Sequence, residues 1–259
     1  MAFSLDHIVI AVTDLDAAMR DYETLGFTVQ AGGEHPRGSR NALVAFEDGS
    51  YLEIIAFGRP APDFRWWQVL SHCGSGLVDY ALLPDNYDDA LWGARARGLE
   101  IEGPIDGARL RPDGVQLVWK TARAPEADIP FLCADVTPRD LRVPDGAARQ
   151  HRNGVTGVAG VTTVVHDLGS STARYRALLN QAPTACGGAP GLGVRTAQFQ
   201  LGAQMLTLVE PHAGASDALS QHLSGRGQGI FAVSFFSPIE QDFDRRLTHG
   251  ARLETVRCL

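Results

Sequence analysis

Residues 5–12 read LDHIVIAV, and this stretch is the most informative segment of the chain for the fold. It is apolar and β-branched on both faces, as expected of a buried strand. Asp14 follows as a candidate helix N-cap, and apolar residues then recur at helical spacing as far as Gly26, which would end the helix. These residues predict a buried strand followed by an amphipathic helix.

Further strands complete the first unit. We expect a short strand at Phe27–Gln30 and a Gly/Pro-rich hairpin at residues 31–40, AGGEHPRGSR. Two more strands, NALVAF at 41–46 and YLEIIAF at 51–57, would be joined by the turn at 47–50. The predicted order is therefore β-α-β-β-β.

The same pattern recurs later in the chain. VAGVTTVV at 158–165 repeats the first strand, and His7 corresponds to Gly160, 153 positions further on. The pair Gly76 and Gly229, each of which opens an apolar strand, has the same offset. A constant offset indicates internal duplication. The sequence predicts an α+β fold of four tandem βαβββ modules, the last cut short at Leu259, that form curled mixed sheets around a cleft.

The modules suggest two halves with a linker between them. We assign residues 1–135 to modules 1 and 2 and residues 155–259 to modules 3 and 4. Residues 136–154 are rich in Pro, Arg, Asp and Gly and are expected to be the linker.

Composition limits the classes of partner. The formal net charge of −7 argues against nucleic acid and against an anionic membrane surface, so a small molecule is the expected partner. The four cysteines form no C-x-x-C pair and are expected to be free thiols in a reducing cytoplasm. The N-terminus reads as a first strand, not as a signal peptide, which also favours a cytoplasmic location.

The run LDHIVIAVTDLDAAMRDYETLGF resembles the opening of vicinal-oxygen-chelate proteins, the glyoxalase/bleomycin resistance/dioxygenase superfamily. The stretches GSRNALVAFEDGSYLEII, PDGVQLVWKTARAPEADIPFL and HRNGVTGVAGV strengthen the resemblance to its glyoxalase-like group. The resemblance covers nearly the whole chain. It implies paired modules around a cleft, in which many members hold a divalent metal through residues of the first and last strands.

Carried onto this chain, that resemblance makes His7 and Glu53 the metal ligands and the catalytic residues. An imidazole and a carboxylate suit zinc, iron, manganese or nickel. The matching positions of the second half hold Gly160 and, after a one-residue shift, Thr207. Neither is a strong ligand, so a single site in the first half is expected.

Glu53 also stands out without the resemblance, because it interrupts an apolar strand. Burial of an unpaired carboxylate costs several kcal/mol, so Glu53 needs a partner, for which His7 is the candidate. A third metal ligand would come from Asp79 or His35. Two alternatives stay open: a metal-free pair in which the apolar strand raises the pKa of Glu53 and makes it a general base, and a purely structural pair.

Three residues are candidates for substrate binding. Of the hairpin arginines Arg37 and Arg40, the second borders a strand and is the one expected to face inward, although a solvated loop is the commoner setting. Arg40 replaces a histidine that the group often shows, which argues against a metal. Asn41 follows it, and Trp119 is expected in the sheet core or the cleft wall.

Two functions follow from these features. The first is a metal-dependent lyase, isomerase or dioxygenase that chelates vicinal oxygens of a small substrate and stabilises an enediolate-like anion. The second is a non-catalytic protein that sequesters a small molecule in the cleft. Superfamily members close the cleft within one chain or across a homodimer, and either arrangement fits the sequence. Trp66 and Trp67, in the connector between modules 1 and 2, would roof the cleft or anchor the connector to the core.

Overall fold

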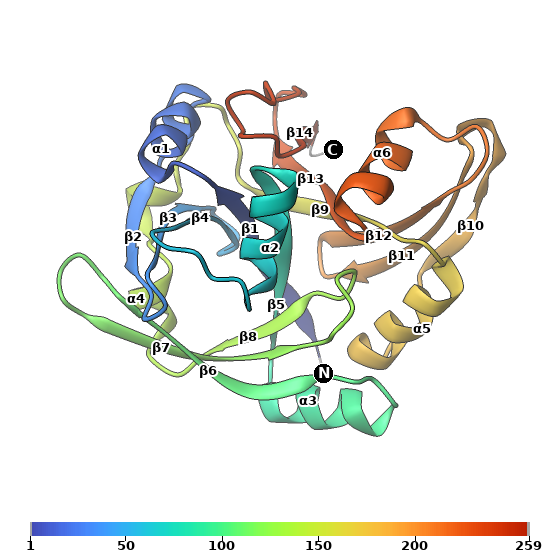
Figure 1. Cartoon of the computed structure of the whole chain (residues 1–259), viewed down its shortest axis with the longest axis horizontal. Coiled ribbons are helices and arrows are strands. Elements are labelled where there is room, and N and C mark those ends of the chain that lie inside the picture. The colour runs from blue at the N-terminus through green and yellow to red at the C-terminus, as the bar shows by residue number, and fades with distance from the viewer. Residues whose placement is uncertain (1, 258–259) are drawn as a thin grey trace.

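The computed structural model describes residues 2–257 and places their strands in two sheets (Figure 1). The first sheet closes into a barrel with the strand order β1 (Phe3–Val12), β4 (Tyr51–Phe57), β3 (Ser39–Ala45), β2 (Gln30–Glu34), β6 (Glu102–Leu110), β7 (Gln116–Arg123), β8 (Phe131–Asp135) and β5 (Gly76–Pro84). The second sheet has the order β10 (Ala185–Ala189), β11 (Val194–Leu201), β12 (Gln204–Pro211), β9 (Gly157–Val164), β13 (Gly229–Ser237) and β14 (Leu253–Arg257).

Helices cover the sheets and connect their strands. They are α1 (Leu15–Thr24), α2 (Arg65–Cys73), α3 (Tyr87–Ala96), α4 (Arg139–Arg142), α5 (Leu168–Leu179) and α6 (Asp217–Arg226), with short 3-10 turns at Gly146–Arg149 and Pro190–Leu192. Among the described residues, none of these helices has the length and apolar character needed to span a membrane.

The predicted α+β class and the curled sheet are confirmed. Asp14 caps α1 as expected, because its carboxylate accepts a hydrogen bond from the Ala17 amide at 2.9 Å. The strand predicted at Phe27–Gln30 is wrong: β2 begins only at Gln30 and extends into the glycine-rich segment that was expected to be a loop. A bulge between Ala31 and Gly33 accommodates the glycines at this position of the sheet.

Strand pairing reproduces the offset of 153 in three dimensions. Antiparallel β1 and β5 pair Ile10 with Leu77, and β9 and β13 pair Thr163 with Ile230. In the parallel pairs, Glu53 lies beside Val9, and Thr207 lies beside Thr162. Thr207 therefore occupies the place of Glu53 in the second sheet, with the one-residue shift that the sequence indicated.

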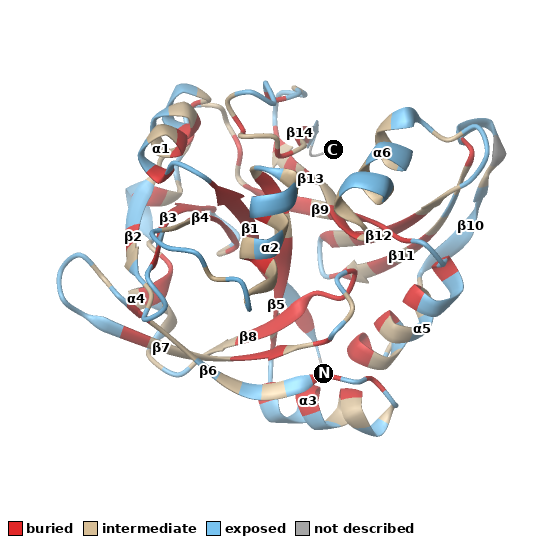
Figure 2. Ribbon diagram, in the orientation of Figure 1, coloured by how far each residue is buried: buried red, intermediate tan, exposed pale blue. Residues whose placement is uncertain are grey.

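One hydrophobic core joins the two sheets, and strands with many buried residues lie where the sheets adjoin (Figure 2). The hydroxyl groups of Tyr80 on β5 and Tyr175 on α5 are hydrogen-bonded within it. A separate apolar cluster fills one part of the barrel and includes Trp66 and Leu70 of α2. The connector that carries Trp66 is thus a helix anchored to the barrel by its tryptophan.

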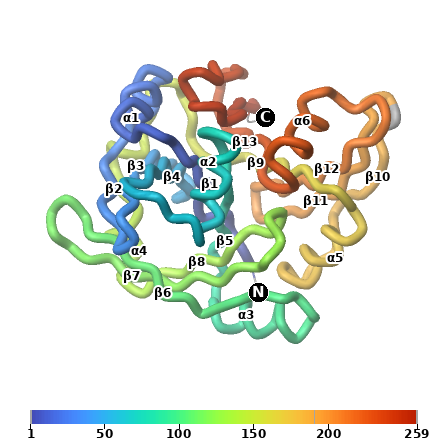
Figure 3. The backbone as a smooth tube through the Cα atoms, viewed as in Figure 1, coloured from blue at the N-terminus to red at the C-terminus, as the bar shows by residue number. Residues whose placement is uncertain are grey.

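The segment 136–154 is more than a linker, because it carries α4 and a 3-10 turn. From β8 the chain returns along the barrel beside β2 and β3 before it enters the second sheet (Figure 3), and the 3-10 turn Gly146–Arg149 packs against β3. Charged residues of α4 thereby reach the interior of the barrel, as described below. Of the four cysteines, Cys73, Cys133 and Cys186 are free thiols, while Cys258 and Leu259 lie outside the described residues.

Candidate functional site

The barrel holds a cavity of about 440 Å³ whose wall includes residues of the β2–β3 hairpin and of α2. One part of its wall is aromatic, and the other part is a compact polar group. The aromatic part comprises Phe57, Phe64, Trp66, Trp119 and Phe131, and the polar part comprises His7, His35, Asn41, Glu53 and Arg109.

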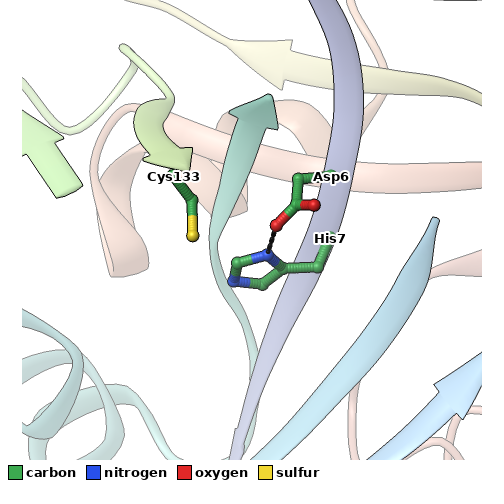
Figure 4. Close-up of side chains that lie close together, drawn as sticks. All are labelled: Asp6, His7 and Cys133. Atoms are coloured by element: carbon green, nitrogen blue, oxygen red, sulfur yellow. Dashed lines mark hydrogen bonds and ion pairs between the residues drawn. The ribbon is translucent and has the colours of Figure 1, made fainter. Parts of the chain in front are cut away.

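His7 projects from β1 into the polar part. It is only 4% exposed, and its ring stacks on Tyr51 with 4.7 Å between centroids. Its Nδ1 lies 2.7 Å from a carboxylate oxygen of Asp6 (Figure 4). This contact fixes the ring orientation and the tautomer, and it leaves Nε2 to face the cavity and Glu53.

Glu53 projects from β4, and its two oxygens face two imidazoles. Its Oε2 lies 3.5 Å from Nε2 of His7, and its Oε1 lies 3.7 Å from Nε2 of His35. Oε1 also accepts a hydrogen bond from the Asn41 side chain at 2.7 Å.

The pKa of Glu53 differs from expectation. Burial alone would raise it, but the opposing effects of His7, His35 and Asn41, with a further one from Arg109, outweigh burial and lower the pKa. The expectation that the apolar strand raises this pKa is therefore wrong. A carboxylate that stays ionised is a metal ligand and a weak general base.

Asn41 binds Glu53 directly, and Arg109 in turn binds Asn41. The Arg109 guanidinium donates to Oδ1 of Asn41 at 3.2 Å, which orients the amide nitrogen of Asn41 towards Glu53. Gly32 makes this packing feasible, since a Cβ atom there would lie 2.1 Å from that Asn41 oxygen. Sequence reasoning missed Arg109, which β6 (Glu102–Leu110), a strand interrupted by glycine and proline, carries into the site.

Behind His7, Asp6 is fully buried and lies between arginines of α4. It accepts hydrogen bonds from Arg139 at 2.6 Å and from Arg142 at 2.9 and 3.1 Å. Burial would raise the pKa of Asp6, but Arg142, His7 and Arg139 together hold it well below its usual range. Arg142 also donates to the Tyr51 hydroxyl at 2.6 Å, so α4 holds both neighbours of the His7 ring. The linker composition gave no sign of this role.

Two groups of side chains are candidates for holding a metal ion. Ligand atoms of Asp6, His7 and Cys133 lie within 4.8 Å of one another (Figure 4). The two Asp6 oxygens are, however, already bound by guanidinium groups, which would repel a cation. Burial raises the pKa of the Cys133 thiol, whereas metals bind the thiolate. This first group therefore does not suit a metal.

The second group, His7, His35 and Glu53, has the donor set of two imidazoles and one carboxylate that zinc and iron sites use. Each histidine has its Nδ1 occupied, by Asp6 or by Ser39, and presents Nε2 to Glu53. Two donors at about 2.1 Å from a tetrahedral ion are about 3.4 Å apart. The separation of 3.5 Å between His7 Nε2 and Glu53 Oε2 approaches that spacing. The separation of 3.7 Å runs from His35 Nε2 to the other oxygen, Oε1, and both values exceed ordinary hydrogen-bond length.

Of the two residues nominated as a third ligand, His35 lies at the site and Asp79 does not. Asp79 accepts hydrogen bonds from Arg65 at 2.6 Å and from the Trp66 indole at 2.8 Å, and Arg123 lies 3.5 Å away. These partners satisfy its charge, and Asp79 does not line the cavity that Glu53 faces, so the nomination of Asp79 is wrong.

Of the three expected substrate-binding residues, two line the cavity and one does not. Asn41 and Trp119 line the cavity, and Trp119 stands edge-on to His35 at 6.0 Å between centroids. Arg40 is exposed and is not part of the wall, whereas Arg37 is. Neighbouring side chains on a strand point to opposite faces, so the inward position of Asn41 turns Arg40 outward. The expectation that Arg40 faces inward is wrong.

Comparison with known proteins gives one family match. The family described as glyoxalase-like domain matches residues 5–179, and no curated protein matches. Among solved structures, a hypothetical protein from Staphylococcus aureus superposes with a TM-score of 0.74 at 12% identity, over 99% of this chain and 100% of the other.

Two enzymes share the fold more distantly. A mutant of 4-hydroxymandelate synthase from Streptomyces coelicolor has a TM-score of 0.62 at 19% identity and covers 90% of this chain and 71% of its own. A fusion of a xylose isomerase-like TIM barrel with 4-hydroxyphenylpyruvate dioxygenase has a TM-score of 0.56 at 17% identity; the match covers 94% of this chain but 38% of the fusion. At these identities the likeness concerns the fold.

Proposed function

Because the chain belongs to the glyoxalase-like domain family, we propose that it is an enzyme of the vicinal-oxygen-chelate type that acts on a small organic molecule held in the barrel cavity. The observation that carries this proposal is the buried Glu53 carboxylate, which faces an imidazole Nε2 on each oxygen at one end of an aromatic cavity. Burial of this polar group has a cost in stability, which a catalytic use would explain.

We propose that His7, His35 and Glu53 hold a divalent metal. Such an ion would polarise substrate oxygens and stabilise negative charge that develops on them. The three donor atoms do not all lie within 4.8 Å of one another, so metal binding would require these side chains to move closer together. Asp6 would keep the His7 ring aligned, and the hydrogen bond from Asn41 would leave Oε2 of Glu53 for the metal.

The remaining wall indicates the kind of substrate. Phe64, Trp66 and Phe131 pack around the Arg123 guanidinium, whose carbon lies 4.3–5.7 Å from their ring centroids. Aromatic walls bury an apolar body, and water is thereby excluded from the polar end. We therefore propose a substrate with an apolar body and an oxygen-bearing end that reaches Glu53.

We also propose that the chain derives from four copies of one module. Within the barrel, the N-caps Asp14 and Asn86 are 72 positions apart. Val9 and Ala81 have the same offset, and their parallel partners Glu53 and Phe131 are 78 positions apart, so Phe131 takes the place of Glu53 if the second module carries six additional residues. In the second sheet, β14 lies parallel to β13 as β8 does to β5, without an intervening helix and hairpin. The fourth copy would then be shortened in its middle.

Metal analysis tests the proposed function. The protein would be purified without a histidine tag, reconstituted separately with Zn²⁺, Fe²⁺, Mn²⁺ and Ni²⁺, desalted and analysed by mass spectrometry. We expect about one ion per chain for at least one metal, and loss of that ion in His7→Ala, His35→Ala and Glu53→Gln. Asp113→Asn, at an exposed position on a distant turn, is the control and should retain the metal. Wild-type protein that retains none of these metals would overturn the metal-dependent mechanism.

A second function, sequestration of a small molecule without catalysis, is favoured by the aromatic part of the wall. The two functions differ in which residues ligand binding requires. Once a ligand is found by thermal-shift screening, a sequestering protein should bind it equally well after Glu53→Gln and lose it after Trp119→Ala. An enzyme of the proposed kind should consume the ligand and lose turnover after Glu53→Gln.

A further inference from the structure

A second cavity, of about 200 Å³, is lined by residues of the second half of the chain and by Leu77 of β5. It is bounded by α6, by β13 and by the segment before β14, which lie close together in Figure 1. It shares no lining residue with the barrel cavity. Its wall contains Arg226, Arg245, Arg252 and His222, and no Asp or Glu is among the residues that line it.

The basic side chains are held in place without being neutralised. Arg226 donates to the carbonyl oxygens of Gly74 at 2.9 Å and Ser75 at 3.3 Å. The Arg252 guanidinium lies 4.6 Å from the ring centroid of Phe231 and makes no hydrogen bond or ion pair with the residues that the structure describes. Carbonyl oxygens and an aromatic face orient a guanidinium but leave its net charge uncompensated.

The positive charges of these side chains are close enough to repel one another. Burial lowers the pKa of both Arg226 and Arg252, and the nearby Arg245 lowers each further. Burial together with Arg226 and Arg252 lowers the pKa of His222 to about 4. The chain as a whole carries a net charge of −7, so this concentration of positive charge is a local feature of the pocket. An anion bound among these groups would relieve their repulsion.

We propose that this pocket binds a phosphate group, either as inorganic phosphate or as the end of a small phosphate ester. The planar guanidinium groups of Arg245 and Arg252 carry pairs of N–H donors that match the spacing of phosphate oxygens, and Arg226, whose terminal nitrogens hold the Gly74 and Ser75 carbonyl oxygens, adds positive charge. The volume equals that of about seven water molecules, at about 30 Å³ each, and therefore accommodates a phosphate with a small organic substituent. Phe231 supplies an apolar surface for that substituent.

Calorimetry and thermal unfolding test the proposal. Wild-type protein would be titrated with inorganic phosphate, glycerol 3-phosphate and acetate at constant ionic strength adjusted with NaCl. The test variants are Arg252→Gln and Arg245→Gln; the second changes an exposed residue and preserves folding even if the first does not. Arg246→Gln is the matched control, because Arg246 is 90% exposed, is bound to Asp244 and does not line the pocket.

We expect saturable binding of phosphate or of glycerol 3-phosphate, with a rise in Tm, and binding weakened by about tenfold or more in both test variants. A preference for glycerol 3-phosphate would identify an ester as the ligand, and a preference for inorganic phosphate would identify the free ion. Arg246→Gln should bind as the wild type does. The proposal is overturned if neither phosphate compound binds, if acetate binds as tightly as they do, or if both test variants retain wild-type affinity.

Discussion

Asp6 shows how much of the site depends on a residue that never reaches the cavity. Its carboxylate binds Nδ1 of His7 and the guanidinium groups of Arg139 and Arg142. Removal of one partner from a buried ion network leaves the other charges without compensation, which is far more costly than the loss of an exposed pair.

We therefore predict that Asp6→Asn lowers the free energy of unfolding by about 3–5 kcal/mol, since the buried Arg142 and its neighbour Arg139 are then left with Asp135 as their one shared carboxylate. Urea unfolding measures this change. Asp113→Asn breaks an exposed pair with Arg111 and should cost less than about 1 kcal/mol. Similar losses in the two variants would show that the Asp6 network contributes no more than a surface pair.

His151 gives the chain a pH dependence that can be assigned to one residue. Its Nδ1 accepts from the Thr28 amide at 3.0 Å, and its Nε2 donates to the Ala45 carbonyl at 3.0 Å, so the folded protein requires the neutral ring. Burial lowers its pKa below the ordinary value. Above a pH of about 6.5 the ring is neutral in both the folded and the unfolded chain. Below that pH the unfolded chain binds a proton at His151 that the folded chain excludes, so stability is lost.

We predict that wild-type stability decreases as the pH falls from 7.5 to 5.5, and that His151→Gln decreases less over the same interval. Urea unfolding of both proteins at the two pH values measures the difference. The same pH dependence in both proteins would exclude His151 as a source of it.

The sequence predicted some site residues and could not predict others, for identifiable reasons. His7 and Glu53 were found because each is a polar residue within an apolar strand, where burial has a cost. Arg109 and Arg142 come from segments whose composition is typical of solvated chain, and only tertiary packing buries them. His35 was nominated, but a hairpin histidine carries no sequence signal that separates it from an exposed one.

At the scale of elements, β9 and β12 show why the second sheet has no counterpart of the His7 site. A Cβ atom on Gly160 would lie 2.7 Å from the backbone oxygen of Met205 on the adjacent strand. A side chain at this position therefore requires β12 to move. The predicted boundaries were accurate for β4 and the predicted first residue for β5, where apolar runs are long, and the boundaries were inaccurate for β2, where glycines interrupt the pattern.

We predict that Gly160→Ala lowers the free energy of unfolding by about 1–3 kcal/mol because of this clash. Gly169→Ala is the matched control in α5, where the new Cβ meets nothing closer than an Asp167 oxygen at 3.4 Å, and it should be neutral or slightly stabilising. Chemical denaturation measures both. Equal stability of Gly160→Ala and the wild type would mean that the strands tolerate a side chain there.

At the scale of the whole molecule, the barrel and the second sheet form one cooperative unit. A single apolar cluster spans both, and ion pairs such as Arg174 with Asp128, at 2.8 Å, cross between them. Arg97 of the α3 C-terminus donates to the Ala177 carbonyl of α5 at 2.7 Å. Extensive burial between two parts of a chain couples their unfolding.

We predict a single unfolding transition. All four tryptophans lie in residues 1–135, so tryptophan fluorescence reports on the barrel, whereas far-ultraviolet circular dichroism reports on the whole chain. The two signals should give coincident urea midpoints. A circular dichroism transition that begins while the fluorescence is still native would show that the second sheet unfolds separately.

The assignment of the metal donors to His7, His35 and Glu53 is tested most directly by the zinc Kd of two variants. Glu53→Gln removes a donor of the proposed group, and Cys133→Ala removes a member of the competing group formed with Asp6 and His7. Calorimetric titration should show zinc affinity weakened by about tenfold or more in Glu53→Gln and unchanged in Cys133→Ala. Affinity lost in Cys133→Ala and retained in Glu53→Gln would contradict the assignment.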